Sequence, residues 1–408
     1  MKCRHCAAPL ESVFLDLGSA PPSNAYLTAD RLAGPEAWYP LRVLVCESCW
    51  LVQTEDFARA EELFDDHYAY FSGFSSGWVD HCRRYAEAMV ERFELGRESS
   101  IVEVACNDGT LLRNFSERGM SCVGIEPTAS TAAAARDLGL EVVEEFLGVT
   151  VAEALAEAGL RADLLAANNV VAHVPDIVDF VAGCGVLLGD DGVATFEFPH
   201  LLRLVDEVQF DTVYHEHFSY LSLTSIRSVA ATAGLQAFDV ERVPTHGGSL
   251  RVFLQRTDVG VRPVTPSIVT LLAEEAEAGV GGRDFYTGFQ ERAEVLKDDL
   301  LRFLLDARQG GRKVVAYGAA AKGNTLLNFA GVRPDLLGAV VDQNPAKQGR
   351  FLPGSRIPIV SEQVVVDERP DHVLILPWNL RDEVADRLDY AREWGATFVV
   401  AVPSLQQW

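Results

Sequence analysis

Short apolar runs alternate with amphipathic stretches through the middle of the chain, from residue 75 to residue 260. The apolar runs predict buried strands at 101–105, 121–125, near 141, 163–167 and 192–198. The stretches between them place apolar residues at helical spacing and predict helices at 111–118, 130–138 and 176–188. Strands that alternate with helices in this way form a doubly wound parallel sheet, whose ligand lies at the carboxyl ends of the strands.

A predicted helix at 224–233 and two further strands, at 236–243 and 250–255, end this segment. A hairpin-like ending after five alternating strands is the seven-stranded arrangement of a class I methyltransferase. Residues 199–220 interrupt the alternation after the fifth strand, so we expect an insertion at the carboxyl edge of the sheet.

The C-terminal part repeats the alternation. Two helical stretches within 265–309 precede strands predicted at 313–317, 337–342, 372–376 and 397–402, which indicates a second, Rossmann-like α/β domain. Its first strand runs into small residues at 318–325 around Lys322. Such a turn either packs closely between strand and helix or lets backbone amides and the lysine hold a diphosphate. We therefore predict three domains, which are listed here by residue number: 1–74, 75–260 and 261–408.

Composition narrows the possible partners. The 408 residues carry a formal net charge of −24, so most of the surface repels a phosphate backbone and we expect no nucleic-acid partner. One basic segment, 302–356, holds nine Lys and Arg against three Asp, which suits either a solvated face or a small anionic ligand. No run reaches the roughly 18 apolar residues of a membrane helix. The N-terminus lacks an apolar signal region, so we expect a cytoplasmic monomer with reduced thiols and no membrane contact.

Four of the eight cysteines form two Cys-x-x-Cys pairs, Cys3 with Cys6 and Cys46 with Cys49. Two such pairs can close a tetrahedron of thiolates around Zn²⁺. Four sulfurs leave no open coordination position, so we expect a structural zinc ion and an N-terminal zinc-binding module. His5, inside the first pair, is a less favoured ligand.

The turn after the first strand of the central sheet distinguishes two cofactors. A dinucleotide needs a glycine-rich turn for its pyrophosphate, whereas this turn has one glycine, Gly109, and a carboxylate, Asp108. The carboxylate suits the ammonium and sulfonium charges of S-adenosylmethionine, and Glu126 after the second strand suits ribose hydroxyls. We therefore predict S-adenosylmethionine and not NAD. The candidate cofactor-binding residues are Glu103, Asn107, Asp108, Gly109, Glu126, Pro127, Asn168 and Asn169.

Within the insertion, Tyr214, His215, Glu216 and His217 place four polar side chains between apolar flanks. A buried imidazole beside a carboxylate can have its pKa moved in either direction, which suits a general base. A hydrogen-bonded core cluster or a pair of metal ligands would use the same residues. In a helical turn Tyr214 and His217 would share a face, whereas in a strand Tyr214 would share one with Glu216.

The chain resembles the sugar C-methyltransferases of deoxysugar pathways, which methylate carbon on nucleotide-linked keto-sugars. The resemblance covers essentially the whole length and rests on the order of its motifs. These are the cysteine pairs, YAYFS at 68–72, NDG at 107–109, GIEPT at 124–128, NVVAHVP at 169–175, YHEH at 214–217, HGGSLR at 246–251 and YGAAAKGN at 317–324. Ala105 is a departure from the pattern, because a glycine is usual there.

The resemblance implies a zinc-binding head, a central S-adenosylmethionine domain and a C-terminal domain that holds the nucleotide sugar. It implies that His217 is the base, and the residues it places near the reacting carbon are Tyr214, Glu216, His173 and Tyr68. The proposed chemistry itself needs a donor to the enolate oxygen, which Tyr214 or a neighbouring histidine can supply, and Glu216 could orient an imidazole and set its tautomer. The candidate substrate-binding residues are His246, Ser249, Arg251, Tyr317, Lys322, Asn324 and Arg350.

We therefore predict an S-adenosylmethionine-dependent C-methyltransferase of deoxysugar biosynthesis. It would deprotonate the carbon beside the ketone of a dTDP-4-keto-deoxysugar and methylate it at C3, with methylation at C5 as the close alternative. Two rivals come from other classes: a nucleotide-sugar-binding protein without turnover, and an NAD-dependent sugar reductase. The reductase would need the glycine fingerprint that this chain lacks.

Overall fold

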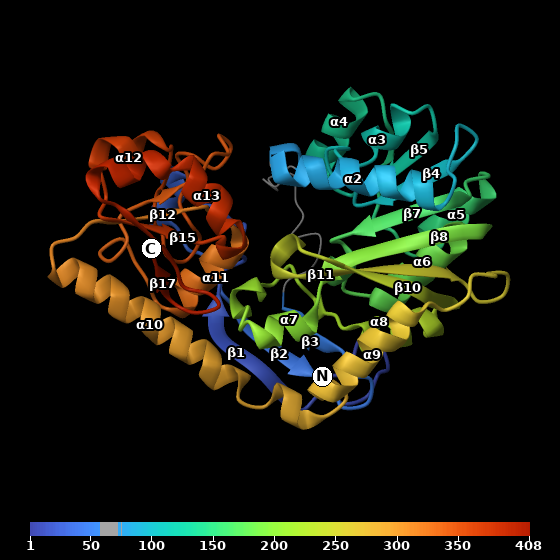
Figure 1. Ribbon diagram of the computed structural model, residues 1–408, viewed down its shortest axis with the longest axis horizontal. Helices are drawn as coiled ribbons and strands as arrows, with labels where there is room; N and C mark the ends of the chain where they lie inside the picture. Colours follow the sequence, from blue (N-terminus) through green and yellow to red (C-terminus); the bar gives the residue numbers. More distant parts are fainter. Residues whose placement is uncertain (58–71, 75) are drawn as a thin grey trace.

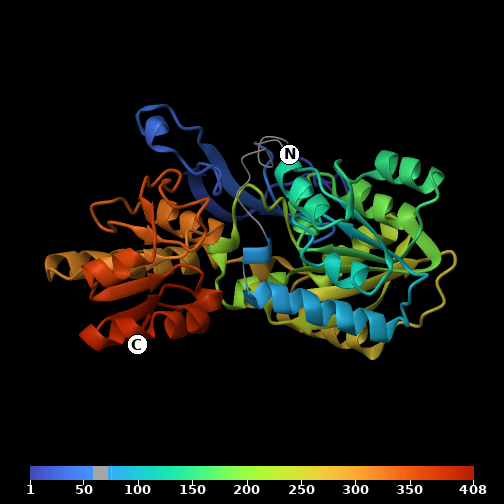
Figure 2. The same ribbon diagram turned by 90° about the horizontal axis from the view of Figure 1, so that it is seen from above.

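The fold is built on three sheets, seen in a computed structural model that describes residues 1–57, 72–74 and 76–408. In Figure 1 the central sheet and its helices form the right-hand lobe, and the C-terminal sheet and its helices form the left-hand lobe. The N-terminal sheet lies below and between the two lobes. The view from above in Figure 2 shows the same separation of the lobes.

The central sheet has the class I methyltransferase arrangement that the sequence predicts. Its strand order is β10-β11-β8-β7-β4-β5-β6, with β8 parallel to its neighbour β7 and antiparallel to β11. The bounds are β4 (Ser100–Val104), β5 (Ser121–Ile125), β6 (Glu141–Val143), β7 (Ala162–Asn168), β8 (Leu188–Pro199), β10 (Leu235–Val243) and β11 (Ser249–Arg256). The carboxyl ends of β4, β5 and β7 therefore meet at one edge.

Both faces of the central sheet are covered, which explains why its strands read as continuous apolar runs. Along β4, Ile101 faces the helices α2 (Ser76–Arg92), α3 (Arg113–Ser116) and α4 (Ala129–Asp137), and Val102 faces the opposite layer. That layer contains α5 (Val149–Glu157), α6 (Ile177–Leu187), α8 (Leu223–Thr232) and α9 (Pro266–Ala278). The helix predicted at 111–118 is shorter, because the Asn114 amide donates to the carbonyls of Thr110 and Leu111 and competes with the helix.

The N-terminal sheet contains one strand from the insertion. Its order is β1 (Ser12–Ala20), β2 (Tyr39–Val45), β3 (Val52–Thr54) and β9 (Ser219–Tyr220). Strand β9 pairs antiparallel with β3, with Val52 opposite Tyr220 and Gln53 opposite Ser219. The residues after His217 are thus tied to the cysteine-bearing module.

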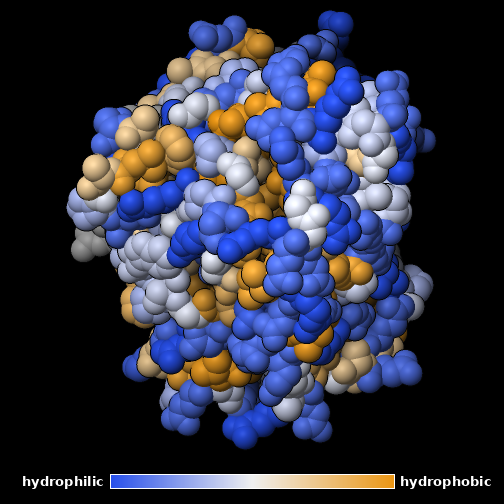
Figure 3. All heavy atoms as spheres, turned by 90° about the vertical axis from the view of Figure 1, so that its left-hand side faces the viewer, coloured by the Kyte–Doolittle hydropathy of each residue, from blue (hydrophilic) through white to orange (hydrophobic). Residues whose placement is uncertain are grey.

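The C-terminal sheet has the order β14-β13-β12-β15-β16-β17, with its first five strands parallel, and confirms the second Rossmann-like domain. Its strands are β12 (Val314–Tyr317), β13 (Val340–Val341), β14 (Ile359–Val360), β15 (His372–Ile375), β16 (Thr397–Val400) and β17 (Gln406–Gln407). The flanking helices are α10 (Phe289–Gln309), α11 (Ala321–Phe329), α12 (Gln363–Glu368) and α13 (Arg381–Arg387). Figure 3 shows the outer face of this lobe, where hydrophilic side chains prevail and hydrophobic ones form scattered groups.

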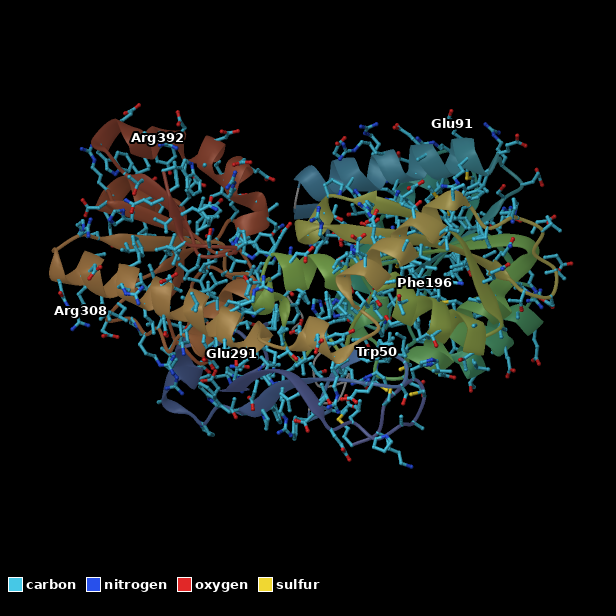
Figure 4. All side chains as sticks on the ribbon, turned by 60° about the horizontal axis from the view of Figure 1, so that its bottom comes forward. Trp50, Glu91, Phe196, Glu291, Arg308 and Arg392 are labelled. Atoms are coloured by element: carbon cyan, nitrogen blue, oxygen red, sulfur yellow. The ribbon has the colours of Figure 1, made fainter. Side chains whose placement is uncertain are left out.

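One hydrophobic core joins the N-terminal sheet, the insertion and the C-terminal lobe. It runs from Leu15 and Val43 through Phe210 to Leu300 and Leu374. Trp50, labelled in Figure 4, stacks on Tyr286 of the short helix η6 (Arg283–Tyr286), which lies between α9 and α10. The ring centroids are 5.9 Å apart, and the angle between the ring planes is 2°. This shared core fixes the insertion between the modules. Among the described residues, every helix is too short or too polar to traverse a lipid bilayer.

Candidate active site

A tight turn brings Tyr214 and His217 to the same side of the insertion. The His217 amide donates to the Tyr214 carbonyl at 2.9 Å, which closes the turn. The Tyr214 hydroxyl then lies 2.8 Å from Nε2 of His217, with ring centroids 4.0 Å apart. Buried Val213 and Phe218 anchor the two ends. The helical-turn alternative from the sequence is therefore the one that describes this pair.

The hydrogen bonds of His217 define its tautomer. Its Nδ1 lies 2.8 Å from the Thr212 carbonyl oxygen, which can only accept, so Nδ1 carries the hydrogen and Nε2 the lone pair. Burial holds the pKa of His217 well below its usual value, and the nearby His173 lowers it further. The imidazole is therefore neutral at neutral pH, as a general base requires.

His173 supplies a second imidazole to the same place. It ends the short helix η3 (Val171–His173) after β7, and its ring centroid lies 4.6 Å from that of His217. Its Nδ1 donates to the Glu216 carbonyl oxygen at 2.8 Å. Loss of contact with water lowers the pKa of His173 to about 4. Two neutral imidazoles thus face each other at the carboxyl edge of the central sheet.

The carboxylate of Glu216 has a different partner from the one predicted. It accepts a hydrogen bond from the Asn24 amide at 2.6 Å, and burial raises the pKa of Glu216 to about 7. The prediction that this side chain sets an imidazole tautomer is wrong, because backbone carbonyls hold Nδ1 of both histidines. Asn24 lies 192 residues away in sequence, and no local pattern marks it.

His215 belongs to the polar run at 214–217 but not to the predicted catalytic set. His215 points to the N-terminal sheet, where Nε2 lies 3.3 and 3.2 Å from the carbonyl oxygens of Tyr39 and Pro40. It therefore supports the turn from behind. Tyr68 lies outside the described residues.

Lys322 and His246 approach the two histidines from the other lobe and from the central sheet. Both contribute to the low pKa of His217, and loss of contact with water lowers the pKa of His246 itself to about 4. Lys322 donates to the Asn379 side-chain oxygen at 2.7 Å, and its ammonium lies 4.6 Å from the centre of the Trp378 ring. Lys322 and His246 therefore lie near enough to His217 to affect its pKa.

Asp211 lies near Lys322, and the sequence did not identify it as a site residue. It accepts a hydrogen bond from the Trp378 indole at 2.9 Å. Burial raises the pKa of Asp211 to about 6, partly offset by the charge of Lys322. Burial also lowers the pKa of Lys322, and the charge of Asp211 opposes that shift. Trp378 thus links the insertion to the C-terminal lobe.

The carboxyl edge of the central sheet offers unsatisfied polar atoms to a cofactor. Within the described part of the chain, Asn168 Oδ1, both polar atoms of the Asn169 amide and Glu103 Oε2 are buried without a hydrogen-bond partner. Glu126 accepts from the backbone amides of Asn107 and Thr128 at 2.9 and 3.0 Å, and its oxygens keep lone pairs for ribose hydroxyls. Pro127 follows directly. These residues fit S-adenosylmethionine.

The turn at 105–109 is strained and tightly packed. Ala105 and Asn107 have φ of 55° and 51°, and Gly109 has φ of 78°. The left-handed backbone favours glycine at position 109, and a Cβ atom there would also displace Leu140, whose Cδ1 would lie 2.4 Å away. Asp108 accepts from the Gly73 amide at 2.8 Å and from the Thr110 hydroxyl at 2.6 Å, so its carboxylate holds the turn itself.

Two of the residues predicted to bind substrate instead bind other residues of the protein. Arg251 pairs with buried Glu197 at 2.9 Å and with Glu241 at 3.1 Å, and the Ser249 hydroxyl donates to the Thr245 carbonyl at 3.0 Å. Glu197 also lies 2.9 Å from His81 Nε2. These contacts make Arg251 and Ser249 part of the scaffold behind His246.

The remaining predicted substrate ligands are spread over the C-terminal lobe. Asn324 is buried, and its Oδ1 has no partner among the described residues. The Tyr317 ring is buried at the end of β12, and Arg350 is half-buried after the loop that follows β13. Gly318 and Gly323 are explained by packing, because a Cβ atom would lie 2.5 Å from Pro377 and 2.7 Å from Leu376.

Four of the nine basic side chains of segment 302–356 form ion pairs. Ion pairs of 2.6 to 3.7 Å join Arg302 to Asp299, Arg308 to Asp335, Lys347 to Asp342 and Arg356 to Glu36. Lys322 is the member of this segment that lies beside the histidines. These four charges are thus neutralised locally, and Lys322 is the functional candidate that lies near His217.

The four cysteines converge as the sequence predicts. The sulfurs of Cys3, Cys6, Cys46 and Cys49 all lie within 4.8 Å of one another. Both Cys-x-x-Cys loops contain the same kind of backbone hydrogen bond. The amide of Ala7 donates to the Cys3 carbonyl, and the amide of Trp50 donates to the Cys46 carbonyl. Four sulfurs in this arrangement fit a tetrahedral zinc ion. His5 is not in the cluster, because its Nε2 lies 3.0 Å from the Ser228 hydroxyl.

Comparison with known proteins matches this organisation along the chain. The family profile described as a putative zinc binding domain matches residues 3–64, and that of a methyltransferase domain matches 78–240. A profile described as the C-methyltransferase C-terminal domain matches 244–403. C-methyltransferase NovU of Streptomyces niveus is 33% identical over 402 residues, which cover 98% of this chain and 95% of that protein.

More distant similarities are confined to part of the chain. Ubiquinone biosynthesis O-methyltransferase of Rhodopseudomonas palustris is 26% identical over 149 residues, 31% of this chain and 58% of that protein. The solved 1,6-didemethyltoxoflavin-N1-methyltransferase of Burkholderia thailandensis is 20% identical and covers 45% of this chain and 82% of that one, with a TM-score of 0.35. The near full-length match and the three profiles show that the chain belongs to the C-methyltransferase family in which a zinc-binding, a methyltransferase and a C-terminal domain follow one another.

Proposed function

We propose that this C-methyltransferase uses S-adenosylmethionine to methylate C3 of a dTDP-4-keto-deoxysugar. The observation that carries the proposal is the state of His217, a buried neutral imidazole whose Nδ1 hydrogen is bound and whose Nε2 lone pair meets Tyr214. The similarity to NovU supports carbon as the methylated atom. The sugar rests on the motifs that resemble sugar C-methyltransferases.

His217 removes the proton in this mechanism. A carbon beside a ketone becomes nucleophilic only after its proton has left, so the site needs a base. Nε2 takes the proton, because Nδ1 already donates to the Thr212 carbonyl. That bond persists in the imidazolium and stabilises its charge, which limits the cost of protonation in a buried place.

Tyr214 then acts on the oxygen of the enolate. Its hydroxyl occupies the Nε2 lone pair, so it must turn away before a carbon can reach His217. The carbonyl oxygen of the substrate is the acceptor we propose for it, since a preorganised donor there stabilises the developing charge. One hydroxyl thus protects the base before binding and stabilises the enolate afterwards.

Residues at the carboxyl edge of the central sheet hold the cofactor in this proposal. S-adenosylmethionine supplies an electrophilic methyl group carried by a sulfonium. Glu126 would accept from the ribose hydroxyls, and Glu103 with Asn168 and Asn169 would use their unsatisfied atoms. His173 extends from the strand-end segment that carries these asparagines, so the same edge would position both reactants.

Lys322 and His246 are our candidates for the anionic part of the substrate. Lys322 is held against Trp378 with a lowered pKa caused by burial, so a diphosphate would restore its favourable charged state. Lys322→Ala should raise the KM for the nucleotide sugar and leave the KM for S-adenosylmethionine unchanged. An unchanged KM for the sugar would remove Lys322 from the binding set.

The test is incubation with S-adenosylmethionine and candidate dTDP-keto-sugars in deuterated water. Solvent deuterium beside the carbonyl reports proton removal, and the product mass and NMR spectrum report the methyl group and its position. His217→Asn should slow exchange by about 10²- to 10⁴-fold and should still bind the cofactor. His215→Asn is the matched control, because that imidazole faces the N-terminal sheet.

The same incubations separate the rivals. Methylation at C5 would place the new methyl group on the other side of the C4 carbonyl, on the carbon that carries the ring oxygen, and the NMR spectrum would show this. Tight sugar binding without exchange or mass gain would favour a binding protein. Equilibrium binding of NAD in place of S-adenosylmethionine would favour a reductase and overturn the proposal.

A further inference from the structure

Arg4, inside the first cysteine pair, reaches from the zinc-binding module to three other segments. Only 5% of its side chain is exposed. Its Nη1 donates to the Pro175 carbonyl at 2.8 Å, and its Nη2 donates to the Thr54 carbonyl at 2.9 Å and to Asp56 at 2.8 Å. Its guanidinium carbon lies 5.4 Å from the centre of the Phe218 ring.

These contacts converge on the backbone of both active-site histidines. Pro175 closes the segment that begins with Asn169 and carries His173. Phe218 follows His217, and its amide donates to the Ala172 carbonyl at 2.7 Å, which joins the two histidine segments directly. Arg4 therefore contacts both histidine segments.

Thr54 completes the connection between Arg4 and His217. Its hydroxyl donates to the His217 carbonyl at 3.2 Å, and its amide donates to the Phe218 carbonyl at 3.1 Å. Its own carbonyl accepts from Arg4. The Arg4 backbone amide also donates to the Gln53 side chain at 2.9 Å, so the first cysteine pair, strand β3 and the turn from Tyr214 to His217 form one hydrogen-bonded unit.

We propose that Arg4 is a positioning residue that sets the separation and burial of the His173–His217 pair; this rests on the proposed function, in which His217 is the base. A buried guanidinium is costly, and only its planar fork can satisfy two carbonyls in different segments at once. Lysine, with one point charge, cannot hold both. Arg4 touches no reacting atom and acts through Thr54 and Phe218.

The expected consequence is a change in the environment of His217. The groups that face this imidazole are Tyr214, Tyr220, His173, His246 and Lys322. If the two segments loosen, water reaches the ring and His173 moves away, and both changes raise the His217 pKa towards its ordinary value. Misplacement of the base should also lower kcat by about tenfold to a hundredfold, without changing the KM for S-adenosylmethionine.

The test compares Arg4→Lys and Arg4→Met with Arg161→Lys. Arg161 also donates to two backbone carbonyls, those of Ala156 and Leu160, and is exposed. For each variant we would measure zinc content, kcat, KM and the NMR titration of the His217 ring, assigned by comparison with His217→Asn. The proposal expects retained zinc, an upward-shifted titration and reduced kcat in the Arg4 variants only.

An unchanged His217 titration with kcat within about twofold of the wild type would overturn the proposal. The titration needs no substrate, so it tests Arg4 even if the wild type methylates none of the candidate sugars and the proposed function fails. If both Arg4 variants lose zinc, Thr54→Val and Phe218→Leu serve in their place. Both weaken the connection between Arg4 and the His217 segment, and neither residue belongs to a cysteine pair. These two variants should then shift the titration in the same direction, and their failure to do so would equally overturn the proposal.

Discussion

The hydroxyl oxygen of Tyr214 lies 2.8 Å from Nε2 of His217, the one ring nitrogen of that imidazole that does not already carry a hydrogen to a carbonyl. The base of the proposed reaction is therefore capped by a donor in the ligand-free protein. A hydrogen bond to the neutral form of a base opposes its protonation, so Tyr214 helps to keep His217 neutral.

Tyr214→Phe should reduce kcat by about 10²- to 10³-fold, the usual effect of losing one donor to a developing oxyanion. It should also raise the His217 pKa, so the acid limb of the kcat profile should move to higher pH. Tyr220→Phe is the control, because its ring packs against the same imidazole with centroids 6.0 Å apart. Equal losses in both variants would attribute the effect to packing and not to the hydrogen bond.

Glu216→Gln should change how stability depends on pH. The folded-state pKa of about 7 lies above the ordinary 4.5, so the wild type holds an extra proton when folded and loses stability as pH rises from 4.5 to about 7. The loss corresponds to ~3 kcal/mol. Glutamine keeps the acceptor for Asn24 and cannot ionise, so the variant should gain stability relative to the wild type across that window.

Urea unfolding at several pH values measures this difference. Glu98→Gln, at an exposed position, is the matched control and should follow the wild type. If the Glu216 variant also ran parallel to the wild type from pH 4.5 to about 7, Glu216 would not be a buried acid with a raised pKa.

Local patterns in the sequence were sufficient for the sheets, because buried parallel strands are continuous apolar runs. Strand β7 shows this, since the predicted range 163–167 lies within Ala162–Asn168. The predicted strand at 337–342 shrinks to Val340–Val341, because only these two residues pair with both neighbouring strands. The convergence of the four cysteines could be predicted equally well, since the spacing of metal ligands within each pair is a local feature of the sequence.

The partners of the candidate site were less accessible to sequence reasoning. Asn24 meets Glu216 across 192 residues, and Trp378 meets Asp211 across 167. No periodicity or motif connects such pairs, since they depend on how the modules pack. The role given to the Glu216 carboxylate was wrong for this reason, because backbone carbonyls that any residue could supply hold the imidazoles.

Ala105→Gly should stabilise the protein. Ala105 has φ of 55°, where a Cβ atom crowds the backbone at a cost of roughly 1–2 kcal/mol. Glycine removes this strain but adds freedom to the unfolded chain, so we expect a net gain of about 0.5–1 kcal/mol. Gly109→Ala is the opposing control and should destabilise, because its Cβ would meet Leu140. A lower urea midpoint for Ala105→Gly would contradict the assignment of strain.

We expect the four cysteines to bind zinc, and removal of that ion should disturb the site around His217 as well as the N-terminal module. The four sulfurs converge within 4.8 Å, and without a metal such a cluster loses the energy that holds its loops together. Strand β3 joins this module to His217 through Thr54, so loosening of the module should change the surroundings of the proposed base.

Cys46→Ser should therefore lower the zinc content below one ion per chain, reduce thermal stability and raise the His217 pKa in NMR titration. Cys122→Ser, at a half-buried cysteine outside the cluster, should keep both zinc and the titration unchanged. Zinc loss with an unaltered His217 titration would show that the metal stabilises its own module alone and that the connection through β3 does not transmit the change.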